Sequence, residues 1–373
     1  MRIGIIAPPW IPIPPSAYGG IESFIDILAR ELVDAGHDVM LAASGDSTSS
    51  VPQLEGFPPA DHETMGVTTH ELRHLIRAYT KFEGADVVVD NTLAGPIVAR
   101  SLRTGPTVTI AHGPFIPLVQ ELYAVASPDM AFVAISHHQA STAGDIPIAR
   151  VIHHGIHVET IPIGPGGDSA CFVGRMNPSK GLPEAITVAE RAGIPLRIAA
   201  KMREPAEEEY FDEVVRPALG SNAEYLGELD ADEKYELMGS SLALLSPIQW
   251  DEPFGLMMIE AMSTGTPVVS TNRGSVPEIV DEGRTGYIRD DLDELAEALG
   301  RTTDLDRGAC RASVEARFTA RRMAADYIAL FEDLVDHPWG RADAQAWPTR
   351  AADESPAAGE QPGRSAVGES TNA

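Results

Sequence analysis

Short apolar runs alternate with segments of helical periodicity along most of this chain. The first apolar run spans residues 3–7, and the helical segment after it begins at Gly19-Gly20 and closes near Gly36. One face of that segment carries the apolar side chains Ile21, Phe24, Ile25, Leu28 and Leu32. Strands joined by helices in this order form a doubly wound parallel sheet. The alternation therefore predicts an α/β fold.

The alternation occurs twice, and a cluster of glycine and proline at 162–168 separates the two series. Apolar runs predict strands at 3–7, 39–43, 86–89, 107–111, 131–135 and 151–153, then at 170–174, 196–200, 242–246 and 268–270. In the second series, helical periodicity predicts helices at 184–192, 207–219, 256–264, 292–299 and 320–335. A chain of 373 residues also exceeds what one hydrophobic core usually serves. We therefore predict two Rossmann-like domains, residues 1–162 and 163–319.

The composition excludes several classes of function. A formal net charge of −27 repels the phosphates of nucleic acids and of anionic lipids. The two cysteines, Cys171 and Cys310, fit no disulfide framework and no metal-binding spacing. No segment approaches the roughly 20 apolar residues that span a bilayer. We expect a cytoplasmic protein without a metal ion, a cofactor or a nucleic-acid partner.

The C-terminal segment 337–373 differs from the rest of the chain. It is rich in Ala, Gly, Pro, Ser and Glu and has almost no large aliphatic side chain. Such a segment buries too little apolar surface to offset the entropy of ordering it. We predict a disordered tail there.

Two carboxylates flank the start of the helix expected at 256–264. Glu252 lies in the loop before it, and Glu260 lies in its second turn. Between them, Gly255 lets backbone N–H groups at the helix start approach a ligand closely, and such a helix end attracts phosphate. Both carboxylates can accept hydrogen bonds from sugar or ribose hydroxyls. Their apolar neighbours favour a pocket over the alternative of two solvated glutamates.

Two cations follow the strand expected at 170–174. Arg175 and Lys180 lie in the turn between that strand and the next helix, at the carboxyl edge where α/β folds bind ligands. Arginine can grip a phosphate through two hydrogen bonds, and lysine can act as a point charge. The alternative is a pair of solvated loop cations. The spacing favours a phosphate site.

Two further features follow strands of the first series. Gly19-Gly20 permits close approach of a ligand to the next helix, although it lacks the G-x-G-x-x-G pattern of dinucleotide sites. His112 follows the strand at 107–111, where it can bond a hydroxyl or exchange a proton. A turn glycine and a structural histidine are the alternatives. The sequence contains no G-x-S-x-G elbow and no P-loop.

These motifs together resemble family 4 of the retaining glycosyltransferases, which have the GT-B architecture of two Rossmann-like domains facing a cleft. The resemblance rests on Glu252-x7-Glu260, on Gly174-Arg175 with Lys180-Gly181, on Gly19-Gly20 and on the strand Thr266-Pro-Val-Val269. It covers residues 1–335 and is densest in the second half. The helix at 320–336 is then expected to cross back onto the first domain.

The resemblance implies roles for the candidate residues. Arg175 and Lys180 would hold the diphosphate of a nucleotide-sugar donor, and Glu260 would bond the ribose. Glu252 and His112 would contact the donor sugar. The remaining donor contacts would come from Gly19, Gly20, Gly227, Phe254, Gly255 and Leu256. The first domain would bind the acceptor, and the second would bind the nucleotide sugar.

The implied reaction transfers a sugar from a nucleotide-diphosphate sugar to an acceptor hydroxyl with retention of configuration. The two cations and helix ends can stabilise the leaving phosphate, which predicts independence of metal ions. Segment 61–86 shows no strong basic stripe, so a small molecule or glycan is favoured over a lipid acceptor. The alternatives are a sugar-nucleotide epimerase, a sugar phosphorylase or a non-catalytic sugar-nucleotide-binding module on the same fold.

Overall fold

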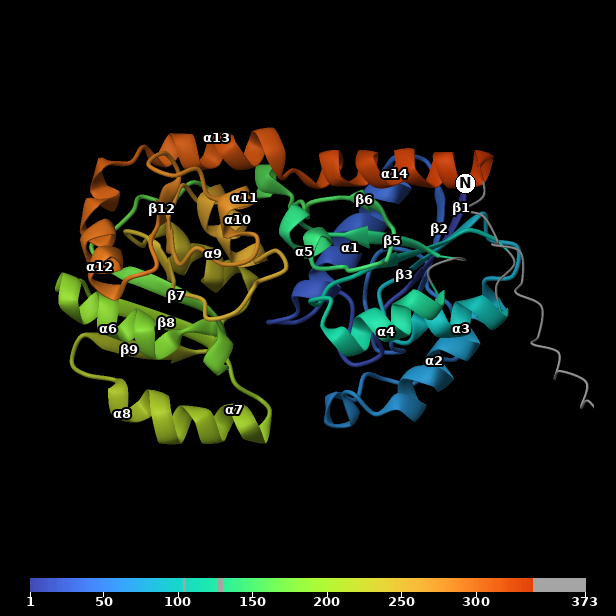
Figure 1. Cartoon of the computed structure of the whole chain (residues 1–373), viewed down its shortest axis with the longest axis horizontal. Coiled ribbons are helices and arrows are strands. Elements are labelled where there is room, and N and C mark those ends of the chain that lie inside the picture. The colour runs from blue at the N-terminus through green and yellow to red at the C-terminus, as the bar shows by residue number, and fades with distance from the viewer. Residues whose placement is uncertain (103–104, 127–129, 338–373) are drawn as a thin grey trace, which may run out of the picture. The chain divides into compact units, whose positions relative to one another are not determined.

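The computed structural model describes residues 1–102, 105–126 and 130–337 (Figure 1). These residues fall within one compact unit, and two parallel six-stranded sheets lie in it. The α/β fold with two doubly wound sheets is therefore confirmed. Except for His337, the tail predicted at 337–373 lies outside the described residues.

The first sheet is built from the first half of the chain. Its strand order is β2-β1-β3-β4-β5-β6, and every pairing is parallel. The register places Ile3 opposite Val39 on one side and Val87 on the other. The strands are β1 (Arg2–Ile6), β2 (Asp38–Ala42), β3 (Val87–Asp90), β4 (Thr107–Ile110), β5 (Ala131–Ala134) and β6 (Ile148–Val151).

Helices cover both faces of this sheet (Figure 1). They are α1 (Gly20–Asp34), α2 (Thr68–Lys81), α3 (Gly95–Leu102), α4 (Pro117–Ala126) and α5 (His137–Ser141), with the short helices η1 (His62–Thr64) and η3 (Val158–Thr160). Strand residues alternate between two buried clusters. One cluster holds Ile5 with Leu28 of α1, and the other holds Ile6 with Leu75 of α2. The two-residue period of a strand thus supplies both faces with apolar side chains.

The second sheet has the order β12-β11-β10-β7-β8-β9, again with parallel pairing throughout. Its order reverses at β7, which lies between β8 and β10. The strands are β7 (Ala170–Arg175), β8 (Leu196–Lys201), β9 (Ala223–Gly227), β10 (Leu244–Ser246), β11 (Val268–Ser270) and β12 (Gly286–Ile288). Strands of the first sheet lie within 1–162 and those of the second within 163–319; the exact domain boundaries stay predictions.

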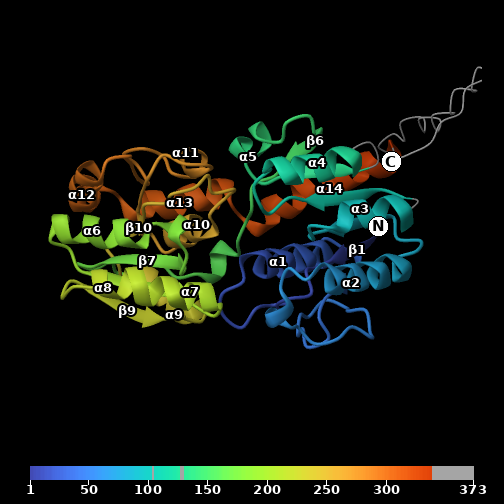
Figure 2. The same ribbon diagram turned by 60° about the horizontal axis from the view of Figure 1, so that its bottom comes forward.

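The second sheet is also covered on both faces, as Figure 2 shows from another side. Its helices are α6 (Leu182–Ala192), α7 (Pro205–Tyr210), α8 (Arg216–Ala218), α9 (Ala231–Gly239), α10 (Leu256–Ser263), α11 (Val276–Ile279), α12 (Leu292–Gly300) and α13 (Arg307–Arg317), with the short helices η4 (Pro178–Lys180) and η6 (Arg301–Asp304). The helix predicted at 207–219 is confirmed as an unbroken helical segment made of α7, η5 and α8. Its middle five residues, η5 (Phe211–Val215), are a π-helix, and Pro217 in α8 cannot donate a helical hydrogen bond.

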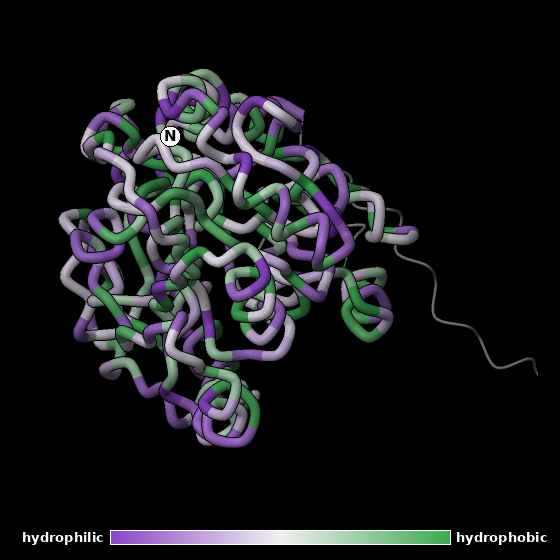
Figure 3. Tube along the Cα trace, turned by 90° about the vertical axis from the view of Figure 1, so that its left-hand side faces the viewer, coloured by the Kyte–Doolittle hydropathy of each residue, from purple (hydrophilic) through white to green (hydrophobic). Residues whose placement is uncertain are grey.

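The last described helix, α14 (Ala320–Asp336), packs on the first half of the chain. It contacts α1, and the ring of Tyr327 lies 6.2 Å from that of Phe24. The guanidinium of Arg322 donates to the carbonyl groups of His153 and His154. Hydrophobic and hydrophilic stretches alternate along the described part of the trace (Figure 3). No described helix has the length and the apolar character that spanning a bilayer requires.

Candidate functional site

The candidate residues of the second half gather where its strand order reverses. Strand β7 ends at Arg175, and the neighbouring strand β10 ends at Ser246. Open α/β sheets bind ligands outside the carboxyl ends of their strands at such a reversal. The loop after β7 carries Lys180, and the loop after β10 carries Glu252. The topology thus brings two loops, about 70 residues apart in the sequence, to one edge.

Lys180 and Glu252 form an ion pair between these loops. Both side chains are largely buried, 13% and 10% exposed. Trp250 donates from Nε1 to Glu252 over 2.8 Å, and its ring centroid lies 5.2 Å from Lys180 Nζ. The carboxylate is therefore held from two directions, and the ammonium group packs over an aromatic face. Trp250 has no part in the sequence-based prediction, because a single tryptophan in a loop carries no pattern.

Arg175 is held by a second cluster of charges. Its guanidinium bonds Glu207, and its Nη2 lies 3.3 Å from Glu204. Lys201, at the end of β8, bonds the same two carboxylates. Glu207 also accepts hydrogen bonds from the backbone N–H groups of residues 203 and 204. Although burial opposes it, hydrogen bonding with the side chain of Glu204, with the backbone and with Arg175 lowers the pKa of Glu207 to about 2. Arg175 and Lys180 thus end on one edge but pair with different carboxylates.

The start of α10 lies between the two predicted carboxylates. Gly255 precedes it with φ +81°, a left-handed conformation in which a side chain would be strained. Glu260, one turn into α10, forms a 2.6 Å ion pair with Lys234 of α9. The side chain of Phe254 is buried and packs 4.9 Å from the ring of His154. The side chain of Phe254 is therefore not available to a site, and its carbonyl group accepts a hydrogen bond from Ser275 Oγ.

The two glycines at the start of α1 approach the second half of the chain. Gly19 precedes α1 in extended backbone, and a Cβ there would lie 2.6 Å from Pro15. A Cβ on Gly20 would lie 3.5 Å from Leu256 Cδ1, at the start of α10. The backbone N–H of Tyr18 donates to Glu228 over 3.0 Å, directly after Gly227 at the end of β9. The structure thus brings the Gly19-Gly20 segment together with Leu256 and with the end of β9 at Gly227.

His112 lies at the carboxyl end of β4. Its Nε2 lies 2.9 Å from Asn91 Oδ1, and its ring packs against Phe24 and His154. Burial lowers the pKa of His112 to about 3, so the ring is neutral at physiological pH. A neutral ring suits hydrogen bonding better than donation of a proton. Among the described residues, no hydrogen bond or ion pair joins His112 to the site residues of the second half.

Glu22 is a buried carboxyl group in the first turn of α1, only 5% exposed. Burial raises its pKa to about 7. A carboxyl group whose pKa is raised by folding contributes stability below the pKa of the unfolded chain, and this contribution is lost as the pH rises to about 7. We expect the stability of Glu22→Gln relative to the wild type to rise by about 2–3 kcal/mol between pH 4.5 and pH 8. Denaturant unfolding at both pH values measures this difference, and a relative stability that stays the same at both would contradict it.

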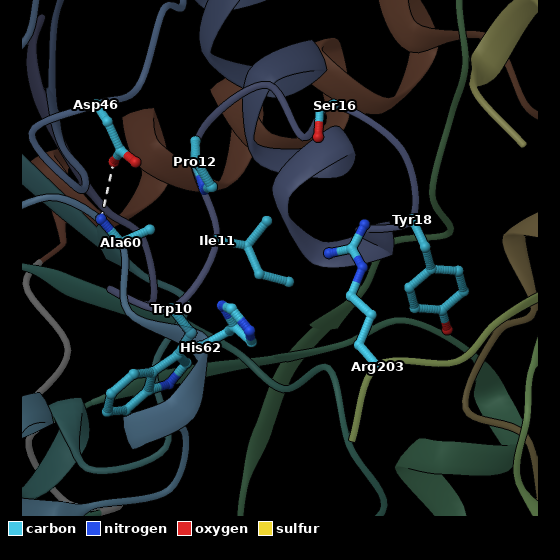
Figure 4. A pocket seen from close by; sticks show the side chains of 9 residues that line it. All are labelled: Trp10, Ile11, Pro12, Ser16, Tyr18, Asp46, Ala60, His62 and Arg203. Atoms are coloured by element: carbon cyan, nitrogen blue, oxygen red, sulfur yellow. Dashed lines mark hydrogen bonds between the residues drawn. The ribbon is translucent and has the colours of Figure 1, made fainter. Parts of the chain in front are cut away.

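A pocket opens beside this site, at the carboxyl edge of the first sheet. Its lining comes from the loop after β1, from the loop after β2 and from the second half: Trp10, Ile11, Pro12, Ser16, Tyr18, Asp46, Ala60, His62 and Arg203. Figure 4 shows Trp10 and His62 on one side and Tyr18 and Arg203 on the other. Arg203 is held by two hydrogen bonds to Glu228, the residue that also binds the backbone of Tyr18. Aromatic, hydroxyl and charged groups converge here, as in small-molecule sites.

One group of described residues has the composition of a metal site. The donor atoms of His137, His153 and Glu278 lie within 4.8 Å of one another. Glu278 already accepts hydrogen bonds from the backbone of His137 and His138 and from His153 Nε2 over 2.8 Å. The carboxylate therefore fastens the start of α5 to α11. These residues are separate from the ion pairs described above.

Two family models match adjacent parts of the chain. The model described as Glycosyltransferase Family 4 matches residues 18–160, and the model described as Glycosyl transferases group 1 matches residues 160–307. Their junction falls between the two sheets. The motifs at Gly19-Gly20 and His112 lie in the first match, and those at Arg175, Lys180, Glu252 and Glu260 lie in the second.

The chain is also similar to named proteins over most of its length. It is 25% identical over 338 residues to a phosphatidyl-myo-inositol mannosyltransferase of Mycolicibacterium smegmatis, covering 80% of this chain and 84% of the relative. It is 26% identical over 339 residues to the phosphatidyl-myo-inositol mannosyltransferase of Propionibacterium freudenreichii, covering 77% of this chain and 82% of that relative. Among solved structures, AviGT4, a glycosyltransferase involved in avilamycin A biosynthesis, superposes with a TM-score of 0.70 at 24% identity, covering 90% and 98%. The structure of Anabaena HepE in complex with UDP and glucose superposes with a TM-score of 0.71 at 18% sequence identity, covering 90% of this chain and 100% of the HepE chain.

Proposed function

Because the chain belongs to family 4 of the glycosyltransferases, we propose that it transfers a sugar from a nucleotide-diphosphate sugar to an acceptor hydroxyl. We further propose that the anomeric configuration is retained and that no metal ion takes part. The observation that carries this proposal is the edge at which Lys180, Glu252 and the start of α10 meet.

The donor diphosphate is proposed to lie between Lys180 and the start of α10. Backbone N–H groups at a helix start attract phosphate, and Gly255 leaves them uncovered by a side chain. A phosphate that binds Lys180 competes with Glu252, since both are drawn to one ammonium group. Glu252 released in this way can accept hydrogen bonds from the hydroxyl groups of the donor sugar. The ion pair between Lys180 and Glu252 thus belongs to the free protein, and a contact between Lys180 and phosphate replaces it when the donor binds.

The nucleoside is proposed to extend from the diphosphate toward α9. Glu260 would accept hydrogen bonds from the ribose hydroxyls. Lys234 Nζ lies 2.6 Å from Glu260 Oε1 and holds this carboxylate in place. Gly227, at the end of β9 with φ +89°, leaves room beside it for the base. Arg175, held by Glu207, would add a second cation at the phosphate. The acceptor would enter from the first half, through the pocket lined by Trp10, Tyr18 and Arg203 (Figure 4).

The chemical step breaks the bond between the anomeric carbon and the phosphate oxygen, while the acceptor oxygen bonds to that carbon. Negative charge grows on the leaving phosphate, and Lys180, Arg175 and the helix start can stabilise it without reorganising. The acceptor proton passes to the departing phosphate oxygen on the same face of the sugar. His112, neutral at physiological pH, would hold a sugar hydroxyl by a hydrogen bond.

A panel of nucleoside diphosphates tests the donor site. We expect UDP, GDP, ADP or TDP to raise the melting temperature of the full chain, because a ligand at one hundred times its Kd adds about 2.7 kcal/mol of stability. The corresponding nucleotide sugars, incubated with candidate small-molecule and glycan acceptors, then report transfer as released nucleoside diphosphate. No shift with any of the four would contradict the proposed donor site. Turnover of the donor without an acceptor would instead indicate an epimerase.

Chelation tests the proposed independence of metal ions. We expect turnover in excess EDTA to stay within about twofold of that without EDTA, because lysine, arginine and helix ends supply the positive charge that a divalent ion supplies elsewhere. Initial rates with and without EDTA, followed by addition of Mg²⁺, Mn²⁺ or Zn²⁺, measure this. Loss of activity in EDTA that one of these ions restores would show the proposal to be wrong.

A further inference from the structure

One face of α2 carries a row of basic side chains. His70, Arg73, His74 and Arg77 follow the spacing of three and four residues that places side chains on one side of a helix. All four line a pocket together with Pro9, Trp10, Pro58, Pro59, Asp61 and Thr64. The pocket lies at the carboxyl ends of β1 and β2, the edge of the first sheet at which ligands bind in such folds.

The arginines of this pocket stand out against the charge of the chain. The protein carries 55 acidic residues and 28 lysines and arginines, so most surface cations have carboxylates nearby. Among the residues described, Arg73 forms no ion pair, and Arg77 donates only to the carbonyl of Gly56 over 3.2 Å. Asp61 is the one acidic side chain that lines the pocket. Two arginines here are therefore not neutralised by carboxylates.

His74 is the buried member of this row of basic side chains, and it is 3% exposed. Its ring packs 4.8 Å from that of Phe57, which fixes the plane of the imidazole. Burial lowers the pKa of His74 to about 4, although the carbonyl groups of Ala7 and Ala42 at the ends of β1 and β2 favour the charged form. The positive charge of the pocket therefore comes from Arg73 and Arg77.

This pocket adjoins the one proposed to admit the acceptor. Trp10 lines both, and the loop after β2 contributes to both. The pocket shown in Figure 4 continues from Trp10 to Tyr18 and Arg203, beside the proposed donor site. A molecule that lies across Trp10 can thus place one end on α2 and the other end toward the donor.

We propose that the pocket on α2 binds an anionic group, a phosphoryl or carboxylate group, of the acceptor. Arg73 and Arg77 supply the fork geometry that such groups bind. The inference rests on the proposed transfer reaction and names a class of acceptor for it. The anion belongs either to a free metabolite or to the headgroup of a lipid, and the two sources require different tests.

Inorganic phosphate is the probe for the site itself. Calorimetric titration compares the full-length wild type and R73Q/R77Q, each saturated with the nucleoside diphosphate that stabilises it most, so that the proposed donor site is filled. We expect phosphate to bind the wild type and to bind R73Q/R77Q at least about tenfold more weakly, because hydrogen bonds to charged groups are the strong ones. Both arginines are exposed and glutamine is a good helix former, so the variant folds. R216Q, which removes an exposed arginine paired with Asp212, is the matched control.

Two further arms identify the source of the anion. Glycerol 3-phosphate represents a free metabolite, and flotation with phosphatidylcholine vesicles with or without phosphatidylinositol represents a headgroup. Binding in either arm that R73Q/R77Q loses supports the proposal and assigns the source. Phosphate, glycerol phosphate and vesicle binding that are all equal in the wild type and in R73Q/R77Q would overturn it. Binding of nucleoside diphosphate, unchanged in R73Q/R77Q, reports separately on the proposed donor site.

Discussion

Replacing Lys180 by alanine will lower turnover by about two to three orders of magnitude. The ammonium group bonds Glu252, packs over Trp250 and lies at the edge where the leaving phosphate is proposed to form. Charge on that phosphate grows in the transition state, so the loss appears mainly in kcat. Steady-state rates of the purified variant, with donor and acceptor varied separately, measure it.

Lys81→Ala is the matched control for this variant. Lys81 is an exposed lysine at the end of α2, and we expect its removal to leave kcat within about twofold of the wild type. Circular dichroism and melting temperature establish that both variants are folded. A Lys180→Ala enzyme with nearly normal kcat would show that the leaving phosphate is stabilised elsewhere.

Replacing Glu207 by glutamine will lower the free energy of unfolding by about 3 kcal/mol. Glu207 is 3% exposed and lies between Arg175 and Lys201, itself 6% exposed. Glutamine keeps the size of the side chain but removes its charge, so the buried ammonium of Lys201 keeps only Glu204 as a partner. Urea unfolding of the wild type and of the variant measures the difference.

The exposed pair of Asp212 and Arg216 provides the control for this stability effect. Both side chains are more than 60% exposed, and Asp212→Asn should change the free energy of unfolding by less than about 1 kcal/mol.

The folded state depresses the pKa of Glu207 to about 2. The stability that the Glu207 carboxylate contributes is therefore present above the pKa of the unfolded chain and disappears as the pH falls toward 2. A Glu207→Gln variant as stable as the wild type at pH 7 would contradict this account of the cluster.

Much of the fold follows from local patterns. The runs predicted as strands at 107–111, 131–135 and 268–270 contain β4, β5 and β11, because strands buried on both faces are rich in apolar and β-branched residues. Strands β9 and β12 were not predicted as strands. Strand β9, Ala-Glu-Tyr-Leu-Gly, contains a charged residue, and β12 is only Gly-Tyr-Ile, so neither forms an apolar run. Pairing with β8 and with β11 identifies them. The strand predicted at 151–153 lies at 148–151, since pairing with β5 sets its register.

The site was less predictable than the fold. Spacing identified Glu252, Glu260, Arg175 and Lys180 as candidates, because each lies in or just after a turn that follows a strand. Spacing could not show which charges pair, and the partners Trp250, Lys234 and Glu207 come from separate elements. Lys201 can be recognised as a candidate from the sequence, because it directly follows the predicted strand at 196–200, as His112 follows the predicted strand at 107–111.

The basic face of α2 shows the same limit. Segment 61–86 mixes acidic and basic residues, so its composition suggested no strong basic stripe. In the structure, His70, Arg73 and Arg77 line one pocket, while Glu71 points elsewhere and accepts hydrogen bonds from the backbone of residues 93 and 94. On a helix, residues three and four apart share one side, so acidic and basic residues of the same segment can lie on different faces. The basic face of α2 can therefore be recognised only once the position of the helix is known.

The most direct measurement is a structure of the full chain with the nucleoside diphosphate that stabilises it most. We predict that its phosphates lie within hydrogen-bonding distance of Lys180 Nζ and of the backbone at the start of α10, that Glu252 has left Lys180, and that Glu260 bonds the ribose. A diphosphate bound elsewhere, with the ion pair between Lys180 and Glu252 intact, would contradict the proposed donor site.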